Sequence, residues 1–314
     1  MDGQRFLNVR EYDPDMFMGI GVQAGGQLLT CGASADVWLV NTPDVDNKCI
    51  LKVVRLNRNI LEENRCPYNP ETAEHMWGEF INRFKSRTNQ WQPLAHENIV
   101  RVLGADEEFC LRIEYLANGT ASQYLAKHAD NSIPLRTKMI GDVLAGLSYL
   151  HSQNPPVIHG CIRMDKLFVD AHGTTKIGEF GLANLVQGFE SSAISMSEEE
   201  LYRWWSPELL QILPDDQQPP YTTASDIWAL GCMFFEIMSG KLPYFRHRRQ
   251  LLIFRDILSN KMPGEQNDIP YPYLDFVEVW TSATSCWERE PEKRPSACSL
   301  WKQHLSQTPG YPVV

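Results

Sequence analysis

The feature that most constrains the fold is a change of hydrophobic pattern near residue 120. Before this point, short apolar runs bounded by turn residues have the pattern of β-strands, and they read GGQLLTCG, ADVWLVN, KCILKVVRL, NIVRVLGA and EEFCLRIEYL. After it, longer segments repeat apolar residues every three or four positions, which is the spacing of one helix face. Strands followed by helices predict an α+β fold with a sheet part and a helical part.

Two predicted features depart from this division. A helix is predicted within the strand-rich third, over residues 72–91, with Thr72 as its cap and with Pro67 and Pro70 in the loop before it. A hairpin of two short strands, LFVD and TKIG joined by AHG, is predicted within the helical part. The remaining helices are predicted in ASQYLAKHA, PLRTKMIGDVLAGLSYLHSQ, TASDIWALGCMFFEIMSG, RQLLIFRDILSN and YLDFVEVWTSATSCWERE.

The composition narrows the class of protein. With 314 residues, 43% hydrophobic and 22% charged, the chain can bury a substantial core. Its formal charge of -10 argues against nucleic-acid or membrane partners, because attraction to phosphate needs clustered Lys and Arg. The eight Cys show no C-x-x-C spacing, which favours reduced thiols over disulfides or zinc. No signal-peptide pattern opens the chain and no apolar stretch is long enough to span a bilayer, so we expect a soluble, cytoplasmic protein.

Seven short motifs occur in a fixed order between about residue 28 and residue 305, and they read ILK, EYLANG, VIHGCI, KIGEFGLA, RWWSPELL, SDIWALGCMFFEIMSGKLPY and CWEREPEKRP. In that order they resemble the strand-three Lys motif, hinge, catalytic loop, metal-binding loop, Ala-Pro-Glu segment, central buried helix and closing helix of protein kinases. The last three are closest to tyrosine-kinase-like domains of the fungal type. The resemblance implies a bilobal fold, with an antiparallel-sheet N-lobe and a mainly helical C-lobe.

The resemblance also implies a division of the chain. We expect an N-terminal extension over 1–28, an N-lobe over 29–116, a C-lobe over 117–306 and a tail over 307–314. The N-lobe contains an insertion at about 57–77, because the distance from the strand-three Lys to the following helix is longer than usual. The extension and the insertion are either docking elements or added packing on the small lobe.

Several residues that match the family pattern have structural roles. Glu208 and Arg294 are expected to form a buried ion pair, for which the forked guanidinium suits a carboxylate. Asp226 is expected to accept hydrogen bonds from the backbone near His159. The resemblance implies an apolar column that joins the lobes, formed by His159, Phe180, Trp91 and Val102.

The residues that would perform phosphoryl transfer are replaced. Cys161 stands at the place of the catalytic Asp and Arg163 at that of the catalytic-loop Lys, while Lys166 and Glu179 occupy the two metal positions. A thiol does not replace a carboxylate as base at neutral pH, and Lys166 places a positive charge where a cation would bind. Glu179 is longer than Asp, and Mg²⁺ tolerates little change of geometry. A Cys161 nucleophile assisted by His159 is disfavoured, because the family buries that His for structural reasons.

The nucleotide site is also altered. Lys52 is retained, but the helix position that faces it holds Arg87 by ungapped counting, or Glu79 if the register shifts. Ile50 above and Phe168 below the adenine slot are larger than the family's usual residues and are expected to fill it. Only one of three loop glycines remains, which weakens the approach of backbone N–H groups to phosphate. The degenerate pocket is expected to consist of Gly32, Val37, Ile50, Lys52, Ile113, Glu114, Leu116 and Phe168.

Three hypotheses for function follow. The first is a catalytically inactive pseudokinase without cofactor or metal, acting as a signalling scaffold or allosteric partner of an active kinase or another signalling protein. The second is an unconventional active kinase that transfers phosphate from ATP, with Mg²⁺, to Ser, Thr or Tyr. The third is a switch that binds nucleotide without turnover.

Overall fold

The computed structural model describes residues 26–31, 35–41, 48–54, 70–105, 110–128, 132–178, 201–211, 219–270 and 277–307. Three predicted site residues, Gly32, Glu179 and Phe180, lie outside these ranges. So do most of the predicted N-terminal extension, most of the predicted insertion and most of the tail. The roles assigned to them stay predictions.

A five-stranded antiparallel sheet forms the first lobe, in the order β1-β2-β3-β5-β4. Its strands are β1 Gln27–Cys31, β2 Ala35–Asn41, β3 Lys48–Val54, β4 Val102–Ala105 and β5 Cys110–Glu114. All five coincide with predicted strands. Ile50 pairs with Ile113 at the middle of the sheet, which places two predicted pocket residues side by side.

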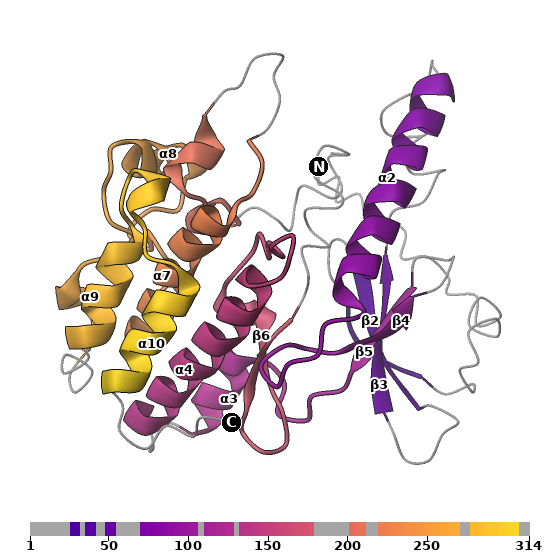
Figure 1. Ribbon diagram of the computed structural model, residues 1–314, viewed down its shortest axis with the longest axis horizontal. Helices are drawn as coiled ribbons and strands as arrows, with labels where there is room; N and C mark the ends of the chain where they lie inside the picture. Colours follow the sequence, from indigo (N-terminus) through magenta and orange to yellow (C-terminus); the bar gives the residue numbers. More distant parts are fainter. Residues whose placement is uncertain are drawn as a thin grey trace, which may run out of the picture.

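One long helix, α2 (Pro70–Trp91), lies beside this sheet (Figure 1). The predicted cap at Thr72 is wrong, because the helix begins two residues earlier at Pro70. Proline suits a first helical position, where its missing N–H would have no partner in the helix. The residues from 70 to 77 that the sequence placed in an insertion therefore belong to α2. Phe80, Phe84 and Trp91 are buried along one side of the helix.

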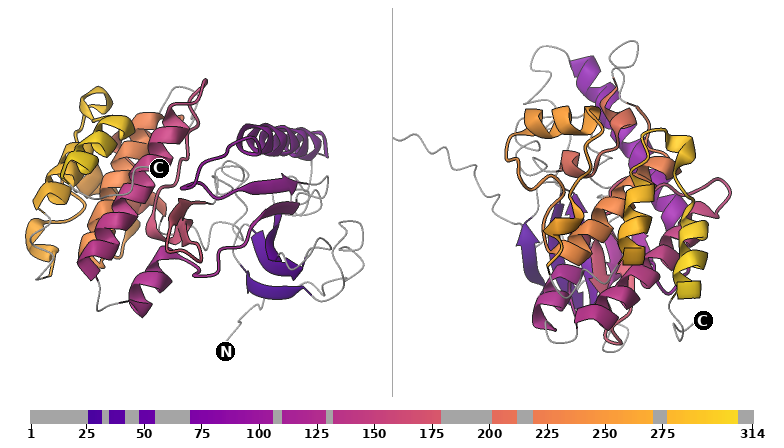
Figure 2. Two further views of the ribbon diagram at one scale, coloured as in Figure 1. Left: turned by 60° about the horizontal axis from the view of Figure 1, so that its bottom comes forward. Right: turned by 90° about the vertical axis from the view of Figure 1, so that its left-hand side faces the viewer.

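The second lobe is mainly helical (Figures 1 and 2). It contains α3 Ala121–Lys127, α4 Ser132–His151, α7 Thr223–Ser239, α8 Gln250–Leu258, α9 Val277–Cys286 and α10 Ala297–Gln307. The predicted hairpin is present as β6 Leu167–Val169 and β7 Thr175–Ile177. The expected closing helix in CWEREPEKRP is wrong, because that segment leaves α9 at Cys286 and forms only a short 3-10 turn at Pro291–Lys293. The last helix, α10, follows it.

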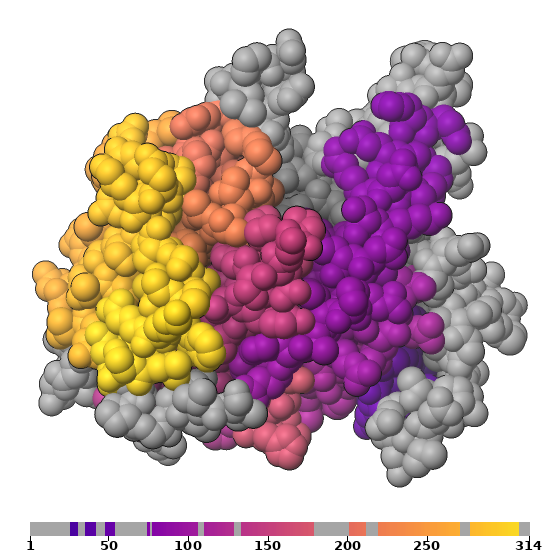
Figure 3. Space-filling model, in the orientation of Figure 1, coloured from indigo at the N-terminus to yellow at the C-terminus, as the bar shows by residue number. Residues whose placement is uncertain are grey.

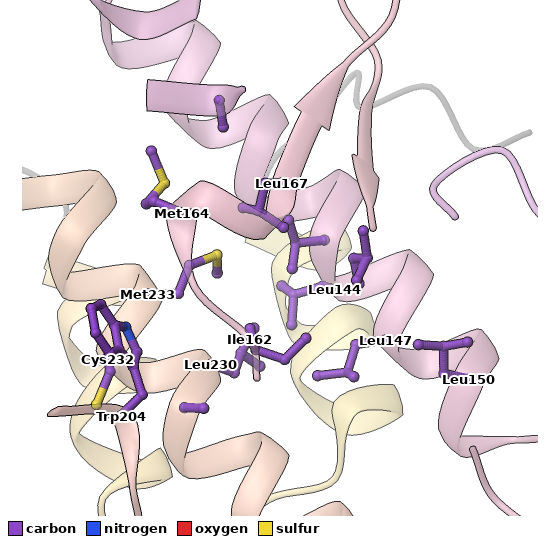
Figure 4. Close-up of a cluster of buried hydrophobic side chains, with 14 of the residues drawn as sticks. Leu144, Leu147, Leu150, Ile162, Met164, Leu167, Trp204, Leu230, Cys232 and Met233 are labelled. Atoms are coloured by element: carbon purple, nitrogen blue, oxygen red, sulfur yellow. The ribbon is translucent and has the colours of Figure 1, made fainter. Parts of the chain in front are cut away.

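Helix α7 is the centre of this lobe. Its residues from Ser225 to Ser239 are all buried, and its start is closed by a capping box at Thr222. Figure 4 shows side chains of the segment 162–167 among the leucines of α4 and residues of α7. The core therefore fixes the loop that carries the candidate site from below.

The two lobes meet along α4 and the hairpin, which lie between the α2 side and the α9–α10 side in Figure 3. Val100 N–H donates to the carbonyl of Ile177 (2.8 Å), and Ile177 N–H donates to the carbonyl of Asn98 (2.8 Å). Backbone hydrogen bonds thus join the segment before β4 to β7. In the described part of the chain, every helix is too short or too polar to cross a bilayer.

Candidate functional site

The loop from residue 157 to residue 166 is held by Asp226 at the start of α7. Its Oδ2 accepts from the backbone N–H of His159 (2.8 Å) and its Oδ1 from that of Gly160 (2.7 Å), as the sequence predicts. The ring Nε2 of His151 lies 3.0 Å from the same Oδ2. Gly160 has φ of +78°, a conformation that favours glycine. Asp226 therefore organises the loop backbone.

His159 is fully buried and uses both ring nitrogens. The backbone N–H of Cys161 donates to Nδ1 (3.1 Å), so Nε2 carries the proton and donates to the carbonyl of Gly178 (2.9 Å). Burial lowers the pKa of His159. Neither nitrogen is available to take a proton from the Cys161 thiol, and this geometry argues against a Cys–His nucleophile.

The apolar column between the lobes is present in its described members. The ring of Trp91 meets that of His159 edge-on, with centroids 6.0 Å apart. Trp91 and Val102 are buried in the main apolar cluster. The column thus connects α2 and β4 to the loop 157–166, named here the catalytic-position loop.

A carboxylate that the sequence analysis did not single out, Asp165, lies among the replaced residues. Arg163 faces it with two nitrogens: Nη2 donates to Oδ2 (2.7 Å) and Nε lies 2.6 Å from Oδ1. The Nζ of Lys166 lies 3.5 Å from Oδ2. The family motif concerns positions 161, 163 and 166, so it does not include Asp165. The signal in the sequence for the Arg163–Asp165 pair was RMDK, in which one acid lies between two cations.

Lys52 and Lys166 place two ammonium groups near this carboxylate. Lys52 is only 3% exposed, and burial lowers its pKa to about 7 against the attraction of Asp165. Burial also lowers the pKa of Lys166, again opposed by Asp165, while the charges of Arg163 and Lys52 lower it further. Cations from both lobes therefore converge at the predicted phosphate and metal positions.

Arg87, which ungapped counting predicts to face Lys52, has its guanidinium bonded to the loop. Its Nη1 donates to the carbonyl of Ile158 (2.9 Å) and reaches Gln90 Oε1 at 3.4 Å. Glu79 is instead bound to Arg83, four residues along α2. The described bonds of Arg87 and Glu79 thus go elsewhere than to Lys52.

The predicted adenine slot contains apolar side chains from both lobes. Ile50, Ile113 and Leu116 are buried and belong to one cluster, against which Val37 and Phe168 pack. A Cβ added at Gly178 would lie 2.9 Å from the Phe168 ring, so this ring packs directly on the Gly178 backbone. Glu114 is engaged by Lys176 Nζ (3.0 and 3.1 Å). The five apolar side chains thus belong to the packing of one cluster.

A resident divalent cation does not fit the described residues. Among them, no group of three or more His, Cys, Asp or Glu side chains is arranged to hold a metal ion. The one acid of the loop, Asp165, is already bonded to Arg163 and Lys166. Mg²⁺ prefers oxygen ligands in near-octahedral geometry and would meet ammonium groups here.

Two further contacts hold the segment 201–211, which contains Trp204 and Glu208. Arg294 donates to both carboxylate oxygens of Glu208 (2.6 and 2.7 Å), which confirms the predicted ion pair, and the side chain of Arg294 is fully buried. Burial raises the pKa of Glu208, but the hydrogen bonds from Arg294 and Ser206 together with the charge of Arg294 outweigh it and hold this pKa below its ordinary value. Trp204 Nε1 donates to Oε2 of Glu236 (2.8 Å), and burial raises the pKa of Glu236 to about 8.

A small pocket is lined by residues of the loop, of the segment 201–211 and of the start of α7. Its lining residues include Gly160 and Cys161 from the loop and Trp204 and Trp205 from that segment. Cys161 itself is only 8% exposed. Cys161, at the position of the catalytic Asp, thus lines the same pocket as two tryptophans.

Residues 32–306 match the family model described as protein kinase domain. The chain therefore belongs to the protein kinase domain family, and its five-stranded sheet followed by helices is the bilobal α+β fold expected from the sequence.

Curated relatives match most of this chain. Mitogen-activated protein kinase kinase kinase 5 of Arabidopsis thaliana is 27% identical over 280 residues, covering 88% of this chain and 35% of the relative. Serine/threonine-protein kinase BCK1/SLK1/SSP31 of Saccharomyces cerevisiae is 28% identical over 230 residues, covering 72% and 15%. Mitogen-activated protein kinase kinase kinase A of Dictyostelium discoideum is 30% identical over 229 residues, covering 71% and 22%. The chain thus spans well under half the length of these relatives.

Proposed function

We propose that this kinase domain is catalytically inactive and serves as a signalling scaffold or allosteric partner. The observation that carries the proposal is the bonding of Asp165 to Arg163 and Lys166. Phosphoryl transfer needs a carboxylate near the acceptor hydroxyl and a bound metal. This loop instead presents a thiol and two cations, and its acid is occupied by those cations.

The setting in signalling rests on the relatives. Their names describe kinases that act in a series of kinases, and we propose a protein kinase or another signalling protein as the partner. The tyrosine-kinase-like grouping and the cytoplasmic location stay predictions, as do the domain boundaries at 28, 116 and 306.

A nucleotide-binding switch without turnover is the second candidate. It is favoured by the positive charges of Lys52 and Lys166, because the charge of Asp165 acts on the pKa of both side chains. Two such cations would neutralise phosphate oxygens without a metal. The apolar packing of Ile50 and Phe168 opposes this candidate. An active kinase would need Glu179, outside the described residues, to hold Mg²⁺ on its own.

Thermal unfolding with millimolar ATP or ADP, each with and without Mg²⁺ or Mn²⁺, tests these functions. A ligand that binds only the folded state raises the melting temperature by mass action. The inactive scaffold predicts no shift in any condition and no phosphotransfer. A shift without metal would establish the switch. A metal-dependent shift accompanied by autophosphorylation would overturn the inactive assignment.

The combined variant Cys161→Asp, Lys166→Asn and Glu179→Asp provides a second test. We propose that Ile50, in the apolar cluster, and Phe168, packed against that cluster, fill the slot, and we therefore expect this variant to remain without phosphotransfer activity. Strong autophosphorylation would show that the slot admits ATP after all. Adding Ile50→Ala to the variant separates the two causes, since it enlarges the slot without changing the loop.

A further inference from the structure

Helix α8 has two apolar sides, only one of which is covered by the residues that the structure describes. Ile253 and Ile257 face inward and are 0% exposed. Leu251 and Leu258 are 79% and 48% exposed, and Arg255 lies between them with 55% of its side chain exposed. Positions separated by four and seven residues lie on one helix face. The outer face of α8 is therefore a leucine stripe that the described residues do not bury.

Basic residues, together named the basic ring, lie before, within and after α8 in the sequence. The segment 246–262 holds five Lys or Arg against a single acid, Asp256, although the whole chain has a formal charge of -10. The described basic residues of this segment are Arg246, Arg248, Arg249, Arg255 and Lys261, and all five are exposed. The exposed Met262, at 54%, extends the apolar area beyond the end of the helix.

Intramolecular bonds neutralise only part of this charge. Asp256 accepts from Lys261 (3.0 Å), Arg255 (2.9 Å) and His247 (2.8 Å), and Arg246 is bound to Asp268 (2.7 Å). Arg248 and Arg249 make no ion pair with any residue that the structure describes. Two exposed arginines thus lie three and two residues before Leu251.

The surface is held in place from behind. The buried Arg203 donates to three carbonyl oxygens of the turn before α8, those of Pro243 (3.0 Å), Tyr244 (3.2 Å) and His247 (3.0 Å). The ring of Trp205 stacks on that of Phe254 in α8, with centroids 6.2 Å apart. A surface already fixed in its bound shape loses less entropy when a partner binds. Figures 1 and 2 show α8 in the helical lobe, away from the five-stranded sheet.

We propose that the outer face of α8 and its basic ring dock an acidic, amphipathic helical segment of a partner protein. The proposal rests on the proposed function only in taking the partner to be a protein. Leu251 and Leu258 are about 10 Å apart along the helix, as seven residues of helical rise require, and this matches the anchors of an amphipathic helix. Glutamates on the flanks of that helix would meet Arg248 and Arg249.

Charge decides between this occupant and an anionic membrane. A membrane presents negative charge to the whole facing side of a protein whose formal charge is -10, whereas a single helix meets only the basic ring. The energy of such an interface is expected to concentrate in the buried anchors, with the charges contributing specificity and association rate.

The test measures fluorescence anisotropy with a designed helical peptide that carries leucines on one face and glutamates elsewhere. A scrambled peptide of the same composition reports charge attraction alone. We expect the pair Leu251→Ser and Leu258→Ser, and separately the pair Arg248→Glu and Arg249→Glu, each to weaken binding at least about tenfold. The matched control, Leu103→Ser with Lys127→Glu, removes one exposed leucine and one exposed cation far from α8 and should leave the affinity within about twofold.

Three results would overturn the proposal: equal binding of the scrambled peptide, no effect of the α8 variants, or stronger binding to phosphatidylserine vesicles that the leucine variant abolishes. Sedimentation of the free protein adds a fourth, a dimer that the leucine variant dissociates, which would make a second copy the occupant. Nucleotide-dependent melting is measured on the same samples. If the peptide docks and the protein transfers phosphate, this proposal is retained and the inactive assignment is removed. If the peptide does not dock and no phosphate is transferred, the inactive assignment is retained and this proposal is removed.

Discussion

The guanidinium of Arg87 on α2 donates a 2.9 Å hydrogen bond to the carbonyl oxygen of Ile158, the residue before the buried His159. Burial lowers the pKa of Arg87, and the charge of Asp226 opposes this. The helix that would pair with Lys52 in an active kinase is therefore tied to the backbone of the catalytic-position loop. This bond joins the two lobes.

Replacing Arg87 tests this connection. Arg87→Met retains most of the apolar stem but leaves the Ile158 carbonyl without its donor, and we expect the free energy of unfolding to fall by about 1–3 kcal/mol. Urea unfolding measures the change. Arg83→Met on the same helix is the control, because its exposed pair with Glu79 should contribute less than about 0.5 kcal/mol. Equal effects of the two variants would mean that the bond to Ile158 does not stabilise the fold.

Because Glu208 and Arg294 are joined by two hydrogen bonds, we expect the free energy of unfolding to depend strongly on the shape of the cation at position 294. Arg294→Ala leaves Glu208 without its partner and is expected to cost about 3–5 kcal/mol. Arg294→Lys keeps the charge but loses the fork, so it should be intermediate. Lys293→Ala, at an exposed neighbour, should change stability little. Chemical denaturation ranks the three, and a Lys variant as stable as the wild type would contradict the importance of the two-point contact.

Glu236 predicts a loss of stability with rising pH. Its pKa is about 8 in the folded protein and about 4.3 in an unfolded chain, so the folded state holds an additional proton between these values. The contribution is fully present below pH ~4.3 and is lost as the pH rises through about 8. Glu236→Gln keeps an acceptor for Trp204, and its stability relative to wild type should therefore improve between pH 5 and pH 9. Melting experiments on both proteins across this pH range measure the difference.

The pKa shift of Lys52 predicts the opposite pH dependence, a gain of stability as the pH rises. Its folded pKa of about 7 is below the ordinary value of about 10.4, so the folded state binds fewer protons and the buried charge destabilises most below pH 7. Lys52→Met should raise the free energy of unfolding at pH 6, by roughly 1–4 kcal/mol, with the gain declining toward pH 10. Peptide docking at α8 should be unchanged. Destabilisation at pH 6 would show that Lys52 contributes more to the fold than its burial costs.

The Cys161 thiol is expected to react slowly. Cys161 is buried, and both nitrogens of the adjacent His159 are bonded, whereas Cys298 is exposed on α10. With iodoacetamide under native conditions, mass spectrometry should find Cys298 alkylated well before Cys161. Faster alkylation of Cys161 would revive the nucleophile that the geometry disfavours. Denatured protein, in which both thiols react, provides the reference.

Much of this architecture could be predicted from the residues in order. The five strands, the hairpin and the helix α7 follow from apolar spacing, because period two and period 3.6 are properties of the local chain. The ion pair of Glu208 with Arg294 could be placed across 86 residues because both belong to ordered family motifs. Boundaries were less secure: Thr72 is a good cap residue, yet the helix begins at Pro70.

The directions of charged side chains were decided only by the tertiary structure. The sequence places Arg87 on a helix, but it does not indicate that the guanidinium binds the carbonyl of Ile158, which lies 71 residues away in the chain. Asp165 became part of the site because folding brings Lys52 from the sheet to a loop of the helical lobe. Whether Leu251 is buried or exposed likewise depends on what packs against α8. Local spacing thus determined the secondary structure and its order, whereas long-range packing determined which charges meet and which surface remains open.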